Sequence, residues 1–167
     1  MTRLAYEKPT ILRHQHNLAN KFGAAPSRRS LSRIDGVSVT DLLEKYGSPL
    51  FVFSEHRQRQ LYREAHRAFT LRYPKVQFAW SYKTNYMDAV CRIFHQEGAW
   101  AEVVSEVEYE MARRNGVPGH QILFNGPYKP EPSLRTAIEE EAHIHIDHYD
   151  ELYTVERLAR EMGRVVG

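Results

Sequence analysis

A single lysine, Lys83, stands where an apolar strand is predicted to give way to a helix. Residues 77–85 read QFAWSYKTN, an aromatic and apolar run followed by a polar turn. Ligands of α/β proteins bind at the carboxyl ends of the strands, so this amine is placed where chemistry takes place. A neutral lysine amine forms imines with carbonyl groups, and burial near other cations lowers its pKa toward that state. The alternative interpretation is a rim lysine whose ammonium group extends into solvent.

Three histidines, His143, His145 and His148, are the nearest approach to a metal site. His143 and His145 share one face of a predicted strand, but no cysteine or third well-placed carboxylate completes a ligand set. Cys91 lies among apolar residues and is expected to be buried as a small hydrophobic side chain. As a lone cysteine it excludes an internal disulfide. We therefore expect neither a metal centre nor a disulfide framework.

The chain around Lys83 alternates between short apolar strands and amphipathic helices. Glycines follow three of these helices and are expected to end them. The predicted strands cover residues 78–82, 100–104, 122–124 and 143–146. The predicted helices cover residues 86–97 and 106–115, a segment from Pro132 to about residue 141, and a segment bearing Leu152 to Met162. Residues 164–167 are predicted to open one more strand.

Upstream of these repeats the pattern is less regular. Residues 1–35 lack periodicity and are expected to form an N-terminal arm. The elements predicted after the arm are a short helix over residues 38–46, capped by Ser38 or Thr40, a strand over residues 50–53, and a helix that Ser54 opens.

Short strands alternating with helices indicate βα units, a parallel sheet and right-handed crossovers. No Gly-x-Gly-x-x-Gly fingerprint follows a predicted strand, which argues against a Rossmann domain. The even spacing favours a (β/α)8 (TIM) barrel, but a complete barrel has eight strands and about 250 residues, whereas this chain has 167. The predicted fold is α/β: about the first half of a barrel over residues 48–167, with an N-terminal extension over residues 1–47.

Composition narrows the possible partners. The chain is 42% hydrophobic and 26% charged, which is typical of a globular protein with a core. Its net charge of +2 and its interleaved charges do not indicate binding to nucleic acid. No apolar run approaches the ~20 residues of a membrane span, and the N-terminal residues are too polar for a secretory signal. A cytoplasmic protein is predicted, with neither nucleic acid nor a membrane as partner.

Residues 80–85 (WSYKTN) resemble the pyridoxal-phosphate attachment site of the ornithine/diaminopimelate/arginine decarboxylase family, which has the alanine-racemase-like fold. Lys83 and Asn85 match that site, whereas Trp80 and Ser81 replace the commoner Tyr or Phe and Ala. Further segments resemble the family in the same order. They are residues 47–53 (GSPLFVF), 97–110 (EGAWAEVVSEVEYE), 122–129 (ILFNGPYK) and 144–152 (IHIDHYDEL), so the resemblance covers the chain from about residue 47 to residue 167.

The resemblance implies a pyridoxal 5'-phosphate (PLP)-dependent amino-acid decarboxylase, with motifs most similar to those of diaminopimelate decarboxylase-like proteins. The cofactor would be bound through an imine at Lys83, and its ring would take up the electrons left when carbon dioxide departs. The implied substrate is a small amino acid, diaminopimelate converted to lysine or a related compound, which belongs to lysine biosynthesis. The family's usual working form is a homodimer with shared active sites.

Some site residues are carried over by position. Glu102 stands where the family has an aspartate near the cofactor and the lysine, and Ser105 follows at the strand end, so both are candidate cofactor-binding residues beside Lys83. Glu102 is one methylene longer than the aspartate. For Ser105 and Glu108, helix capping and a site role are both open. Lys129 follows a tight turn at the same edge, where a structural contact and a catalytic role are both open.

Other parts of the family's site lie later in its sequence. They comprise a histidine stacked on the cofactor ring, a Gly-rich phosphate loop, an acid paired with the pyridine nitrogen, and a Cys-containing segment from the second subunit. None of them is present within these 167 residues, so weak cofactor binding is expected of this chain alone. The alternatives to a decarboxylase are a non-catalytic PLP-binding barrel protein and an inactive or partner-dependent fragment whose sheet edge another chain covers.

Overall fold

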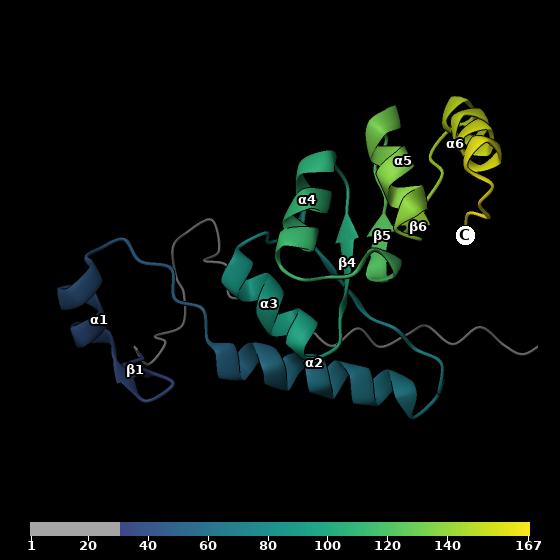
Figure 1. Ribbon diagram of the computed structural model, residues 1–167. Helices are drawn as coiled ribbons and strands as arrows, with labels where there is room; N and C mark the ends of the chain where they lie inside the picture. The colour runs from purple at the N-terminus through teal and green to yellow at the C-terminus, as the bar shows by residue number, and fades with distance from the viewer. Residues whose placement is uncertain (1–30) are drawn as a thin grey trace, which may run out of the picture. The chain divides into compact units, whose positions relative to one another are not determined.

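The computed structural model describes residues 31–167, which divide into a small N-terminal unit that ends at Leu50 and an α/β unit, Phe51–Gly167 (Figure 1). The predicted N-terminal arm lies almost entirely outside the described residues. None of the helices between residues 31 and 167 is long and apolar enough to cross a membrane.

The small unit contains a hairpin of β1 (Arg33–Ile34) and β2 (Val37–Ser38), followed by the helix α1 (Val39–Tyr46). Asp35 and Gly36 form the turn with φ values of 47° and 81°, because a two-residue hairpin turn requires positive φ at both positions. Sequence analysis missed this hairpin, although the Asp-Gly pair was the available signal. The predicted cap is confirmed, since Ser38 Oγ accepts the amide hydrogen of Asp41.

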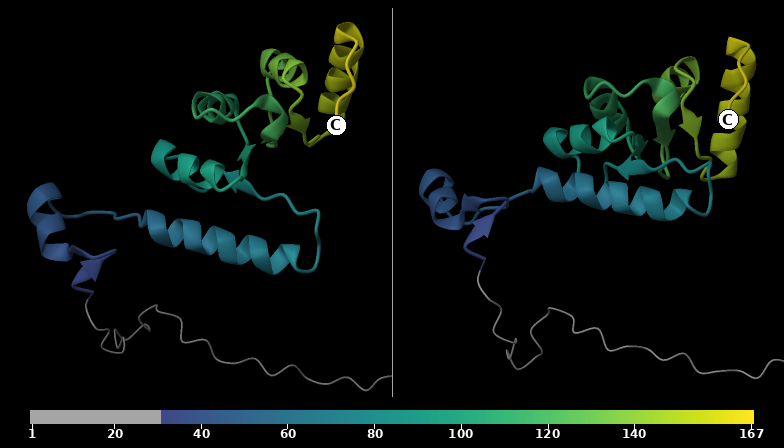
Figure 2. Two further views of the ribbon diagram at one scale, coloured as in Figure 1. Left: turned by 60° about the horizontal axis from the view of Figure 1, so that its bottom comes forward. Right: turned by 90° about the horizontal axis from the view of Figure 1, so that it is seen from below.

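The α/β unit confirms the predicted alternation of strands and helices. Its strands form one parallel sheet in the order β3-β4-β5-β6, which is the sequential order of βα units. Successive helices follow one another in the order of the strands (Figure 2). The elements are α2 (Glu55–Thr70), β3 (Ala79–Ser81), α3 (Asp88–Gln96), β4 (Trp100–Val103), α4 (Glu106–Arg114), the short 3-10 helix η1 (Gly119–Gln121), β5 (Ile122–Phe124), α5 (Glu131–Glu139), β6 (His143–Ile144) and α6 (Tyr149–Met162).

The core of this unit lies between the sheet and its helices. Alternate strand residues point to this side and are buried, as the period of two requires. Cys91 of α3 is fully buried, which confirms the prediction of a small hydrophobic residue there. The buried strand residues are Ala101, Val103, Ile122, Phe124 and Ile144, and the helix residues they join in the core include Tyr109, Ala112, Leu134 and Leu158.

The prediction of a strand over residues 50–53 was wrong. These residues form no strand, and Phe51 is 88% exposed. A strand exists only where a neighbour completes its hydrogen-bond ladder, and none of the described strands pairs with this segment. An apolar run shows the propensity for a strand but does not supply the neighbour.

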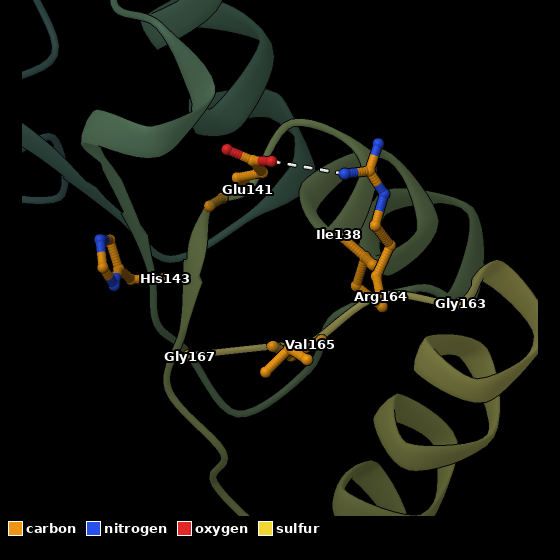
Figure 3. Close-up of a pocket in the computed structure, with 9 residues that line it drawn as sticks. Ile138, Glu141, His143, Gly163, Arg164, Val165 and Gly167 are labelled. Carbon is orange, nitrogen blue, oxygen red and sulfur yellow. Dashed lines mark hydrogen bonds and ion pairs between the residues drawn. The ribbon is translucent and has the colours of Figure 1, made fainter.

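At the end of the chain, residues 164–167 have a neighbouring strand but do not form a strand themselves. The amide of Ile144 in β6 donates a hydrogen bond of 3.1 Å to Gly167 O. Figure 3 shows this segment beside β6, where Arg164 pairs with Glu141 at 3.4 Å. These residues help to line a pocket of about 390 Å³. The predicted strand over residues 164–167 is therefore not formed, although the segment makes one backbone hydrogen bond to β6.

Glu97 joins the end of α3 to α2. Its carboxylate accepts hydrogen bonds from Arg63 Nε at 2.6 Å and from Arg59 Nη1 at 2.9 Å. The Arg63 guanidinium, followed by that of Arg59, lowers the pKa of Glu97 from 4.5 to about 2. The carboxylate thus holds two turns of α2 against α3.

We expect this contact to make the unfolding free energy sensitive to acid. The pKa of Glu97 is lower in the folded chain than in the unfolded chain, so its stabilising effect is complete above pH 4.5 and is lost as the pH falls toward 2. Glu97→Gln is expected to flatten the pH dependence in this window, measured by denaturant unfolding at several pH values. Glu156→Gln, which removes an exposed pair with Arg160 within α6, is the control. Parallel pH profiles for the two variants would contradict the assignment.

Candidate functional site

The carboxyl ends of the four parallel strands lie along one edge of the sheet. Tyr82, the residue after β3, is buried on the helix side, and Ser81 before it belongs to the opposite face. Lys83 follows in the turn and is exposed. In the ladder Ser81 pairs with Glu102, which places Glu102 on that face too. The register also confirms the predicted parallel pairing of these two strands. An exposed amine in the turn after β3 and a carboxylate on the face of β4 opposite the helices therefore belong to the same edge of the sheet.

Lys83 occupies the turn that leaves β3. On one side of it, the amide of Tyr82 donates to Glu102 O at 3.0 Å, and on the other the amide of Thr84 donates to Ser81 O at 3.1 Å. The Lys83 side chain is exposed, and its amine forms no hydrogen bond or ion pair with any residue from 31 to 167. An amine without an ionic partner is available for a covalent bond.

Glu102 is held by an amide from the next strand. Asn125 Nδ2 donates to Glu102 Oε1 at 3.2 Å, and the backbone amide of Asn125 donates to Val103 O at 2.8 Å. Sequence analysis did not single out Asn125 as a site residue. Its signal was a polar residue directly after a buried strand, on the same face as Glu102. This edge of the sheet thus carries an amine, a carboxylate and an amide.

Ser105 and Glu108 form a reciprocal cap at the start of α4. Ser105 Oγ accepts the amide hydrogen of Glu108 at 3.3 Å, and Glu108 Oε2 accepts that of Val104 at 2.9 Å. This resembles a capping box, in which two side chains satisfy two free amides, except that Glu108 reaches the residue before the N-cap. The geometry supports the capping alternative for both residues. The Ser105 hydroxyl keeps its hydrogen for another acceptor, so its cofactor-binding role stays a prediction.

Lys129 makes a structural contact at the same edge. Its Nζ is fully buried and donates to Gly126 O at 2.7 Å and to Glu151 Oε1 at 2.8 Å. The second oxygen of Glu151 accepts the amide hydrogen of Asp147 at 2.9 Å. An ammonium committed to a carboxylate is not free to react, so of the two interpretations of Lys129 the geometry favours the structural one.

Gly126 brings the turn after β5 close to β4. Its φ is 100°, and a Cβ atom built there would overlap the carbonyl oxygen of Val104. Only glycine has both the conformational freedom and the space that this position demands. The turn also supplies the carbonyl that Lys129 contacts and follows Asn125, which holds Glu102.

Gly126→Ala is expected to lower the free energy of unfolding by roughly 2–5 kcal/mol, since positive φ costs ~1–2 kcal/mol and overpacking ~1–3 kcal/mol. Gly163→Ala is the matched control, because its φ is also positive at 61° but nothing lies within 4 Å of the new Cβ. It should cost only about 1 kcal/mol. The free energies of unfolding of the two variants are compared by denaturant unfolding. Equal decreases would show that the close approach of Gly126 to Val104 does not contribute to the cost of the substitution.

Two of the three histidines near the end of the chain have side-chain contacts, and these contacts are separate. His143 stacks on Trp100 with ring centroids 5.2 Å apart, and His148 Nδ1 accepts the amide hydrogen of Glu151 as the cap of α6. Within the described part of the chain no group of three His, Cys, Asp or Glu side chains is arranged to hold a metal ion.

The donor set fits the attachment of an aldehyde-bearing cofactor. Such a group needs a primary amine with free space around it, and Lys83 is exposed and unpaired within the described structure. A neighbouring carboxylate with a fixed orientation, Glu102 held by Asn125, offers a polar contact beside it. The arrangement can bind a carbonyl compound covalently and hold it against the open face of the sheet.

Comparison with known proteins decides the family. Residues 59–166 match the family described as "Pyridoxal-dependent decarboxylase, pyridoxal binding domain". The chain belongs to this family. Its relatives include the diaminopimelate decarboxylase from Methanothermobacter thermautotrophicus, which is 32% identical over 132 residues; the match covers 79% of this chain and 31% of the relative. The diaminopimelate decarboxylase from Bacillus subtilis is 32% identical over 134 residues, and that match covers 80% of this chain and 30% of the relative.

Solved structures of the family's enzymes share the fold. Diaminopimelate decarboxylase from Methanocaldococcus jannaschii superposes with a TM-score of 0.70 at 32% identity, covering 80% of this chain and 32% of that one. A protein from Aquifex aeolicus superposes with a TM-score of 0.69 at 26% identity over the same shares. The likeness confirms the α/β fold and the partial barrel. The decarboxylase family is also the one that the motifs around Lys83 resembled, and PLP is its cofactor. The chain spans about a third of the length of these relatives.

Proposed function

We propose that this chain forms the cofactor-attachment part of a PLP-dependent amino-acid decarboxylase that converts diaminopimelate to lysine or acts on a related amino acid. The observation that carries the proposal is Lys83, an unpaired amine at the carboxyl end of β3 in a chain of the pyridoxal-dependent decarboxylase family. Relatives named diaminopimelate decarboxylase, one of them solved in complex with L-lysine, support this choice of substrate. Since the chain spans about a third of their length, the activity is proposed for the complete active site.

The residues on the open face have distinct proposed roles. Lys83 would bind the cofactor covalently, and its amine would hold or deliver a proton near the reacting carbon. Glu102 would orient the bound group, with Asn125 fixing the carboxylate. Ser105 would donate its hydroxyl hydrogen to the cofactor while its oxygen caps α4. When bound, PLP supplies an electron-withdrawing ring that stabilises a carbanion.

The family resemblance also supports a homodimeric working form and a cytoplasmic location. The proposed partner is a small amino acid, with neither nucleic acid nor a membrane involved. The relatives support an enzyme over a non-catalytic PLP-binding barrel protein, because those cited are named decarboxylases.

Chemical trapping tests the proposal directly. The chain is incubated with PLP, reduced with borohydride and digested, and the modified peptides are identified by mass spectrometry. We expect the pyridoxyl group on Lys83, well above its level on the exposed Lys75 or Lys45. Equal modification of all exposed lysines, or none at all, would contradict a cofactor site at Lys83.

A further inference from the structure

A buried polar network lies directly behind Lys83, on the helix side of β3. Tyr82 is fully buried, and its hydroxyl oxygen lies 3.0 Å from His95 Nε2 and 3.4 Å from Asn115 Nδ2. His95 lies near the end of α3, and Asn115 is the residue that ends α4. The side chain next to the candidate catalytic lysine is therefore bonded to two helices at once.

The hydrogen-bond directions in this network follow from its chemistry. His95 Nδ1 lies 2.8 Å from the carbonyl oxygen of Ala99, which can only accept, so Nδ1 carries the hydrogen and Nε2 of the neutral ring accepts. Tyr82 therefore donates to His95, and Asn115 donates to the Tyr82 oxygen. Burial lowers the pKa of His95 and raises that of Tyr82, which keeps both groups neutral. Asn115 also donates to Asp88 at 3.1 Å, so both hydrogens of its amide are used.

The turn is also held on the other side of Lys83. The carbonyl oxygen of Asn85 accepts hydrogen bonds from Trp80 Nε1 at 3.0 Å and from Cys91 Sγ at 3.5 Å. Its side-chain Oδ1 accepts the amide hydrogen of Met87 at 3.0 Å. Lys83 is thus flanked by two fixed residues while its own side chain has no partner among the described residues.

We propose that Tyr82, His95 and Asn115 form a positioning network that fixes the direction in which Lys83 leaves the strand. The inference rests on the proposed function, since it concerns the same lysine. Tyr82 and Lys83 are consecutive residues of the turn after β3, so a rotation of the backbone that moves the phenol also moves the amine. Holding a reacting group in place before it reacts lowers the entropic cost of bond formation. The three residues act through the backbone and do not touch the cofactor.

The chain offers a matched control in Tyr109. This tyrosine is also buried, and its hydroxyl donates to Glu140 at 2.7 Å, but it packs on Phe124 of β5 rather than beside Lys83. Tyr82→Phe removes a hydroxyl that bonds to His95 and Asn115, whereas Tyr109→Phe removes a hydroxyl that bonds to Glu140. Each change leaves buried polar groups without a partner. The two variants are therefore compared at equal fractions folded, measured by denaturant unfolding, so that any difference between them at Lys83 reports position rather than folding.

Two measurements on the 167-residue chain test the inference. The first, without cofactor, is hydrogen exchange at the amides of Thr84 and Asn85, both bonded to Ser81 O. The second is the PLP concentration that gives half-maximal borohydride trapping on Lys83. Tyr82→Phe is expected to speed the exchange and to raise that concentration between about twofold and tenfold, the equivalent of one neutral hydrogen bond. Tyr109→Phe should change neither, and His95→Gln serves as a second variant should Tyr82→Phe unfold.

The outcomes separate this inference from the proposed function. Unchanged trapping in Tyr82→Phe, with or without faster exchange, overturns the positioning role and leaves the cofactor site intact. Equal effects of the two tyrosine variants overturn it as well. Absence of trapping in the unmodified chain overturns the proposed attachment of PLP. In that case hydrogen exchange tests the positioning role by itself. Faster exchange in Tyr82→Phe but not in Tyr109→Phe supports the role, and any other result contradicts it.

Discussion

Replacing Lys83 by alanine is expected to abolish borohydride trapping of PLP at this site. Only a primary amine forms the imine that borohydride reduces, and no other lysine lies on the turn after β3. The folded chain should survive the change, because the Lys83 side chain is exposed and makes no hydrogen bond or ion pair with the described residues. Trapping at this site should therefore be lost completely. The free energy of unfolding should change by no more than about 0.5 kcal/mol.

Two controls separate chemistry from charge. Lys75→Ala removes another exposed lysine, from the loop that precedes β3, and should leave trapping at Lys83 unchanged. Lys83→Arg keeps the positive charge but cannot form the imine, so it should behave like Lys83→Ala. Trapping that persists at the same total level in Lys83→Ala would mean that another amine holds the cofactor, and the proposed site would be wrong.

Removing the buried ammonium of Lys129 is expected to have the largest effect on stability. Lys129→Met leaves the carboxylate of Glu151, whose side chain is 3% exposed, without its cation. Breaking a buried ion pair on one side costs about 3–5 kcal/mol, because the remaining charge stays desolvated. Denaturant unfolding should show a loss of this size, whereas removing the exposed Arg160–Glu156 pair should cost less than ~1 kcal/mol.

A second substitution distinguishes an unpaired charge from lost packing. In Lys129→Met with Glu151→Gln, no charge is left buried, and the glutamine oxygen can still accept the amide hydrogen of Asp147. The double variant should recover a large part of the stability lost in Lys129→Met. The Lys129 ammonium also lies over the Phe124 ring. If the double variant is no more stable than Lys129→Met, the lost stability comes from packing around Phe124 and not from the unpaired carboxylate of Glu151.

Local sequence patterns were sufficient to predict the four strands of the parallel sheet and the helices that follow them. Periods of two and 3.6 separate strands from helices, and Gly163 ends α6 in the left-handed conformation that its position required. Lys83 could be singled out as a candidate because its signal is contiguous: the strand, the lysine and the turn fall within nine residues, 77–85. The order of the strands followed from the alternation itself.

Contacts between distant side chains could not be predicted in the same way. Asn125 reaches Glu102 across 23 positions, and Lys129 reaches Glu151 across 22, and nothing in either local pattern names the partner. For Ser105 the sequence could not separate capping from a site role, because a hydroxyl at a helix start serves both. Residues 50–53 had the composition of a strand and no neighbour to pair with, so tertiary context overrode propensity.

The carboxylate of Glu151 has a consequence for redesigning the loops at this edge of the sheet. One of its oxygens binds the lysine that follows β5, and the other binds the backbone that follows β6. The two loops are therefore mechanically coupled, and a shift in one reaches the next through a single rigid group. A change in the loop after β5 will therefore also disturb the start of α6, so the two loops must be redesigned as one segment.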